Sequence, residues 1–337
     1  MEENKVHLTS GEMAVLWTGY LNDSMSMPLL DYFVKTVEDN EIKPVIEFAR
    51  QLSDGHIKVL KDIFQNEKFP VPRGFSSDDV NLDAQKLYTD TFMLEFIMQM
   101  AKSGLIAYGS SLGMCARKDL RAYFIKCIDQ TVELFEKATD IALEKGIYLR
   151  RPFIDIPAET DMIDDKSYLS GLNPLKKPRP LNAIEIAHLS FNVETNMVGT
   201  MLALSFSQAA KSKEIISYME RGRDISKKHV KVLSATLLDN DIQAPNSADY
   251  AVNGNDESPF SERLMMQLMA FLSALGSGNY AAAASASQRS DLILNYERLS
   301  LEIAQFAKDG ADIMIKHKWL EQPPGSPNRT DLARRQS

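Results

Sequence analysis

The stretch SDGHIKVL, residues 53–60, has a near copy 173 residues later, SKKHVKVL, residues 226–233. The serine, histidine, lysine, valine and leucine keep their places in both. Such a match within one chain indicates an internal repeat, and a repeat predicts a fold that is built twice from the same unit.

The repeat extends over most of the chain. At an offset of 173 the pairing runs without a gap from Leu8/Leu181 to Gly74/Ser247, and a second block continues at an offset of 172. A gap-free match of this length predicts a tandem duplication. Identical pairs include Glu12/Glu185, Phe33/Phe206, Arg50/Arg223, His56/His229, Tyr108/Tyr280, Arg117/Arg289 and Asp119/Asp291.

Composition narrows the class of protein. The net charge is -8, which argues against a broad nucleic-acid-binding face, because phosphate contacts require clustered Lys and Arg. No apolar run reaches the length of a membrane-spanning helix, and the first residues lack the apolar core of a signal peptide. We therefore expect no nucleic-acid or membrane partner and a cytoplasmic protein.

Each copy shows the periodicity of helices. In the first copy, Leu16, Tyr20 and Asp23 follow one another at three- and four-residue steps, and residues 45–63 repeat the rhythm around His56. Short connections near residues 39–40 and 116 flank a long one at 68–83. Short, long, short is the connectivity of a ferritin-like bundle. The sequence predicts an all-α fold: a tandem duplication of a ferritin-like four-helix bundle with one long crossover per copy.

The expected organisation has four parts. Residues 1–149 form the first four-helix bundle, and residues 181–324 form the second. Residues 150–180 carry several prolines and predict a linker, and residues 325–337 predict a disordered tail.

Five stretches resemble a known family: residues 8–26 (LTSGEMAVLWTGYLNDSMS), 145–157 (KGIYLRRPFIDIP), 179–192 (RPLNAIEIAHLSFN), 258–269 (SPFSERLMMQLM) and 310–324 (GADIMIKHKWLEQPP). The chain is similar to a domain-of-unknown-function family of spore-forming bacteria, number 3231. Its members resemble tandem ferritin-like bundles and, distantly, spore-coat-type ferritin-like proteins. The resemblance implies the fold and, as an alternative to a cytoplasmic location, association with the spore. It transfers no catalytic residue.

A ferritin-like fold raises the hypothesis of a di-metal centre. That centre needs Glu-x-x-His on two of the helices, and only Glu185 and His188 have this spacing, on the first helix of the second copy. The first copy has Val15 at the position equivalent to His188. The pattern predicts that the standard centre is absent or degenerate. The cofactor stays open between none and an iron, manganese or zinc ion.

The repeated histidines suggest a different site. If the first two helices of each copy are antiparallel, His56 lies level with Asp23, and His229 lies level with Asn196. The favoured interpretation is a core histidine that has a hydrogen-bond partner; the alternative is a metal ligand or a proton-handling group. Pro28 should kink the first helix nearby. A functional pocket, if one copy keeps it, is expected beside Asp23, Pro28 and His56.

A second polar cluster is expected where the fourth helix of each copy begins. Glu12 and Glu185 fall at this level, with Asp119 and Asp291 respectively. We interpret the cluster as a network of helix caps and salt bridges. The alternative is a mononuclear metal site made of Glu185, His188 and Asp291.

Small residues mark the ends of the third helices, as SGLIAYGSSLGMCA (residues 103–116) and GSGNYAAAASAS (residues 276–287). They predict that the two bundles pack on each other through their third helices, with a homodimer or a protein partner as a further possibility. The first function hypothesis is a non-catalytic structural or interaction protein, sporulation- or stress-related. The alternative is a metal-binding protein or oxidase with a non-standard or degenerate site in one bundle. A small-molecule binder is a third hypothesis.

Overall fold

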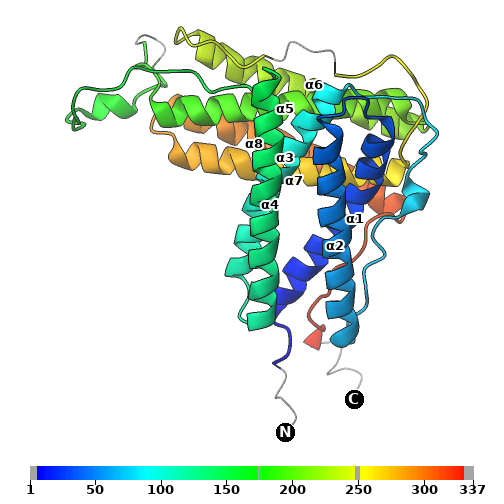
Figure 1. The fold of residues 1–337 in the computed structure, drawn as a ribbon. Helices are drawn as coiled ribbons and strands as arrows, with labels where there is room; N and C mark the ends of the chain where they lie inside the picture. Colours follow the sequence, from blue (N-terminus) through cyan, green and yellow to red (C-terminus); the bar gives the residue numbers. More distant parts are fainter. Residues whose placement is uncertain (1–5, 174, 176, 247–250, 330–337) are drawn as a thin grey trace.

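The protein, a computed structural model, is described over residues 6–173, 175, 177–246 and 251–329. These residues form an all-α fold with two isolated β-bridges and no strand (Figure 1). The helices of the first copy are α1 (Ser10–Thr36), α2 (Lys43–Asn66), α3 (Asp90–Gly113) and α4 (Lys118–Glu144); those of the second are α5 (Ala183–Ala209), α6 (Lys213–Leu238), α7 (Glu262–Ala286) and α8 (Ser290–Lys316), and the 3-10 helices are η1 (Ser77–Asp79) and η2 (Lys166–Leu169).

Each copy consists of two helix hairpins, as the short, long, short connections predict. The most extensive contacts join α1 with α2, α3 with α4, α5 with α6 and α7 with α8. Local signals set the helix ends. Thr9 and Asn182 begin α1 and α5 with capping boxes. Pro44 lies in the first turn of α2, where its missing N–H costs nothing. No helix in the described part of the chain is long and apolar enough to cross a membrane.

The two long crossovers pair with each other around a pseudo-two-fold axis. Val80 bridges Phe260 and Tyr88 bridges Val252, both antiparallel. At the offset of 172, Val80 corresponds to Val252 and Tyr88 to Phe260, so the two bridges are symmetry copies of one contact. The backbone hydrogen bonds follow the same symmetry: Asn81 N–H donates to Pro259 and Asn253 N–H to Leu87, while Ser261 N–H donates to Asp79 and Thr89 N–H to Ala251.

A shared hydrophobic core lies where the copies meet. One cluster of buried residues includes side chains from all eight helices and from both crossovers. The methionines Met265, Met266 and Met269 belong to it, as their helical spacing predicts. A smaller cluster fills the far end of each copy. The division into domains at residues 149 and 181 stays a prediction. Residues 330–337 of the predicted tail lie outside the described residues.

The prediction that the copies pack through small residues of their third helices is wrong. The copies meet mainly through α3 against α5 and α1 against α7, and their helices run roughly crosswise (Figure 1). Gly109, Ser110 and Gly113 are exposed. The reason lies in the crossovers: they hold the first residues of α3 and α7 near the pseudo-two-fold axis, so the small residues at the opposite ends point away from it.

Candidate functional site

A polar cluster lies inside the first copy and draws one side chain from each of its four helices. His56 of α2 is 6% exposed. Its Nδ1 lies 3.3 Å from Asp23 Oδ1 of α1 and 3.1 Å from the hydroxyl of Tyr108 of α3. Its Nε2 lies 3.1 Å from Gln130 Oε1 of α4. The predicted contact between His56 and Asp23 is therefore present.

The second copy repeats this cluster with one exchange. His229 of α6 is fully buried, and its Nδ1 lies 2.9 Å from the hydroxyl of Tyr280. Its Nε2 lies 3.0 Å from Glu302 Oε2 of α8. Asn196 of α5 reaches the tyrosine, because its Nδ2 donates to Tyr280 at 2.9 Å. In the first copy the carboxylate, Asp23, lies on α1 and the amide, Gln130, lies on α4. In the second copy the amide, Asn196, lies on α5 and the carboxylate, Glu302, lies on α8.

The exchange sets different protonation states. In the first copy both ring nitrogens of His56 face acceptors, the oxygens of Asp23 and Gln130, which favours the doubly protonated imidazolium. Burial disfavours that charge, but hydrogen bonds and charge from Asp23 and Cys127 outweigh it and raise the pKa of His56 to about 10.

His229 has the opposite shift. Burial lowers the pKa of His229, and this effect outweighs the attraction of Glu302, whose side chain is 32% exposed. A neutral imidazole also fits the hydrogen bonds in sequence: Asn196 donates to Tyr280, Tyr280 donates to Nδ1, and Nε2–H donates to Glu302. The first copy therefore holds a buried ion pair, and the second holds a neutral histidine that is hydrogen-bonded to Tyr280 and to the carboxylate of Glu302.

A cavity of about 410 Å³ lies beside the first cluster. Asp23, His56 and Tyr108 line it, together with apolar side chains from α1 to α4 and from α5 and α7 of the second copy. Asp23 is 5% exposed, and its Oδ2 is buried without a hydrogen-bond partner. A buried carboxylate oxygen without a hydrogen-bond partner costs free energy. Its position at the cavity wall indicates that a bound molecule could supply the missing partner.

The equivalent level of the second copy carries larger side chains. Thr131 and Leu134 line the cavity from α4. Their equivalents at the offset of 172 are Ile303 and Phe306, which are larger and buried. Phe306 stacks on Tyr218 with ring centroids 4.2 Å apart. At these two positions the side chains of the second copy therefore occupy more volume than those that line the cavity of the first.

Sequence reasoning found the histidine and Asp23 but missed two members of the cluster. Tyr108 and Tyr280 are an identical pair in the repeat, yet a tyrosine in a helical stripe predicts only core. Gln130 and Glu302 match at the offset of 172, and comparing them would have revealed the exchange of carboxylate and amide.

The end cluster is a capping network in both copies. Glu12 Oε1 accepts from the backbone N–H of Ala116 at 3.0 Å and of Arg117 at 2.9 Å, just before α4. The same carboxylate accepts from the N–H of Thr9, so it caps two helices at once. Hydrogen bonds to Thr9, Arg117 and Ala116 lower the pKa of Glu12 although burial opposes this.

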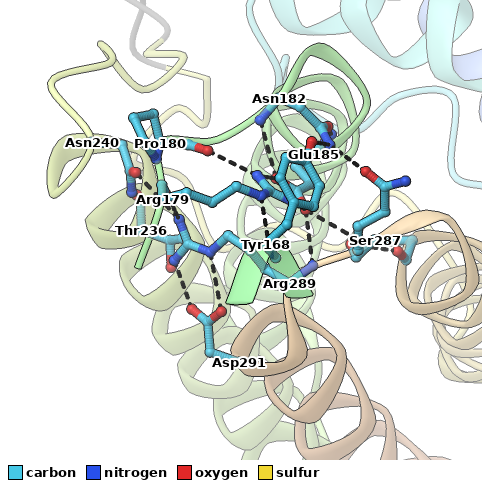
Figure 2. A network of polar contacts seen from close by, with 12 residues as sticks. Tyr168, Arg179, Pro180, Asn182, Glu185, Thr236, Asn240, Ser287, Arg289 and Asp291 are labelled. Carbon is cyan, nitrogen blue, oxygen red and sulfur yellow. Dashed lines mark hydrogen bonds and ion pairs between the residues drawn. The ribbon is translucent and has the colours of Figure 1, made fainter. Parts of the chain in front are cut away.

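The second copy adds an arginine to the network. Glu185 is fully buried and accepts from Arg289 N–H at 3.0 Å, while Arg179 of the linker pairs with both of its oxygens (Figure 2). Asp291 is paired with the Arg289 side chain at 2.7 Å (Figure 2). The oxygens of Glu185 and Asp291 thus already serve N–H groups.

The proposed mononuclear set does not form one cluster. His188 is partly buried, and burial alone lowers its pKa. Among the described residues, no group of three or more His, Cys, Asp or Glu side chains is arranged to hold a metal ion. Glu185 instead caps the start of α8 through the backbone N–H of Arg289, and Asp291 pairs with the side chain of Arg289.

Comparison with known proteins identifies the family. The model of a family described as "Protein of unknown function (DUF3231)" matches residues 1–159 and again residues 169–332. The chain belongs to this family. The two family matches cover the two copies of the repeat in turn, so this chain carries the family unit twice.

No curated protein matches this member of the family. Among solved structures, the chain is similar to a crystal structure of a candidate spore coat protein from Bacillus halodurans, with 20% identity over 46% of this chain and 98% of that one. The TM-score is 0.37. Neither fold nor function follows from a likeness at this level.

Proposed function

We propose that the protein is a non-catalytic binding protein whose first copy holds a small, largely apolar molecule. The cavity beside Asp23 and His56 carries this proposal. Its volume of about 410 Å³ lies within the range of small-molecule sites, and it combines apolar walls with a few converging polar groups. In this proposal the second copy serves as a packed support that supplies part of the wall through α5 and α7. We also propose that each bundle has a ferritin-like arrangement and that the domains have the predicted boundaries. A structural or interaction role is compatible with this binding function.

Binding of an apolar fluorescent probe tests the proposal. We expect N-phenylnaphthylamine to bind with a stoichiometry of one per chain. The double variant Thr131→Ile/Leu134→Phe gives the first copy the side chains of the second and should weaken probe binding by about tenfold or more, equivalent to about 1.4 kcal/mol. Ile125→Phe is the matched control, because Ile125 lies on the same helix and is 49% exposed. Binding that is absent, or equal in all three proteins, would refute the proposal.

Metal binding by the central cluster is a second candidate function. Asp23 and His56 are two adjacent groups able to ligate an ion, and the unpaired Asp23 Oδ2 favours this candidate. The untagged protein, expressed with ample iron, manganese and zinc, would be analysed for metal beside His56→Ala and His188→Ala. Stoichiometric metal that only His56→Ala loses would favour metal binding at the central cluster. Loss only in His188→Ala would favour the end cluster.

A further inference from the structure

The polar groups at the cavity have unequal hydrogen-bonding capacity left. Both ring nitrogens of His56 are engaged, by Asp23 and Tyr108 on one side and by Gln130 on the other. His56 therefore has no N–H free for a bound molecule. The carboxylate of Asp23 uses only Oδ1, over contacts of 3.3 and 3.5 Å, and Oδ2 has no partner. Asp23 Oδ2 therefore lacks a hydrogen-bond donor, which a bound molecule could supply.

The charges at the cavity further restrict which head group of a ligand can lie next to Asp23. Among the described residues that line the cavity, Asp23 is the one carboxylate and His56 the one basic side chain, and their charges neutralise each other. A ligand carboxylate next to Asp23 would face a like charge in a low-dielectric site and would find no free imidazole N–H. A hydroxyl or an ammonium group would instead donate to Asp23, because an ionised carboxylate only accepts.

The shape of the cavity indicates a chain-like ligand. On α1 the lining runs from Ala14 to Leu29, which corresponds to about 22 Å along a helix. One part of the lining, at Ala14, Thr18 and Met114, is exposed and forms a mouth between α1 and α3. Beyond Asp23 the walls come from both copies and are mostly apolar, with Leu29, Phe96, Val198, Leu268 and Leu272 beside the polar Ser26, Gln99 and Thr195.

We infer that the ligand is a single-chain amphiphile whose alcohol or amine head donates a hydrogen bond to Asp23 and whose tail lies against the second copy. The inference rests on the proposed binding function and deepens it by naming the chemical class. The second copy lacks both requirements, because Asn196 replaces the carboxylate and Phe306 fills the space.

The test is displacement of bound N-phenylnaphthylamine by dodecanol, dodecylamine and dodecanoate from the full chain. We expect dodecanol and dodecylamine to compete at least tenfold better than dodecanoate, since a hydrogen bond to a buried charge is worth a factor of this size. In Asp23→Asn this preference should fall by about tenfold or more. Asn occupies the equivalent position in the second copy, so the fold accommodates an amide there.

The outcomes separate the inference from the function on which it rests. Probe binding with equal competition by the three heads, or with dodecanoate as the best competitor, would overturn the inference and leave the binding function standing. An unchanged preference in a folded Asp23→Asn protein would also overturn it. If the probe does not bind to the natural protein, both fail. If Asp23→Asn does not fold, the comparison of head groups on the natural protein still decides.

Discussion

The two copies carry the same histidine, the same tyrosine and the same helix hairpins, yet their interiors differ. The first encloses a buried ion pair, Asp23 and His56, beside a cavity. The second holds a buried neutral histidine, His229, that is hydrogen-bonded to Tyr280 and Glu302. The exchange of one carboxylate between helices and the loss of side-chain volume at two positions accompany this difference. A duplicated fold can therefore keep its framework in both halves while the side chains inside the halves diverge.

The largest expected effect comes from making the second copy resemble the first. Ile303→Thr/Phe306→Leu removes buried apolar volume and should lower the free energy of unfolding by about 3 kcal/mol, because a packed core does not fully close over lost volume. The reverse variant, Thr131→Ile/Leu134→Phe, fills existing space and should change it by less than about 1.5 kcal/mol. Urea unfolding measures both. Equal losses in the two variants would contradict the claim that only the first copy is open.

A smaller difference is expected between the two capping carboxylates. Glu185→Gln removes a buried charge that serves a backbone N–H and Arg179, so it should cost about 2–3 kcal/mol. Glu12 accepts from backbone N–H groups and from the Thr9 hydroxyl. Glu12→Gln should therefore lower the free energy of unfolding by about 1–2 kcal/mol. Thermal and urea unfolding of both variants test the order. A larger loss in Glu12→Gln would contradict it.

The two histidines should respond to pH in opposite directions. The pKa of His56 is raised, so its stabilising contribution is complete below about pH 6.5. That contribution is lost as the pH rises toward about 10. The pKa of His229 is lowered, so below about pH 6.5 the unfolded chain binds the proton first and stability falls. An NMR titration of the imidazole protons resolves both residues, and Asp23→Asn should lower the pKa of His56. A neutral His56 at pH 7 would contradict the assignment of an ion pair.

The smallest effect is expected from placing the missing carboxylate in the second copy. Asn196→Asp should raise the pKa of His229, because a second acid then lies near the ring that already contacts Glu302. Gain of a carboxylate should not create a probe site, since Phe306 still fills the interior. The titration and the fluorescent probe together check this prediction. Binding of a second probe per chain in this variant would show that charge, rather than volume, decides which copy binds.

The repeat of SDGHIKVL as SKKHVKVL, with its helical periodicity, was enough to predict an all-α duplication and to place His56 level with Asp23. Those features depend on spacing along one or two neighbouring helices, which a sequence displays directly. Caps were equally visible, because Thr9 and Glu12 lie within one turn of each other.

Only the tertiary structure decided how the copies meet and which of them is open. The small residues of α3 and α7 suggested a contact between those helices, but the pairing of Val80 with Phe260 and of Tyr88 with Val252 places the beginnings of α3 and α7, rather than their small-residue ends, where the copies meet. The cavity depends on Thr131, Leu134 and the approach of α5 and α7, residues far apart in sequence. Helix periodicity is a local property, whereas empty volume is what remains after every helix has packed, and no single stretch of sequence specifies it.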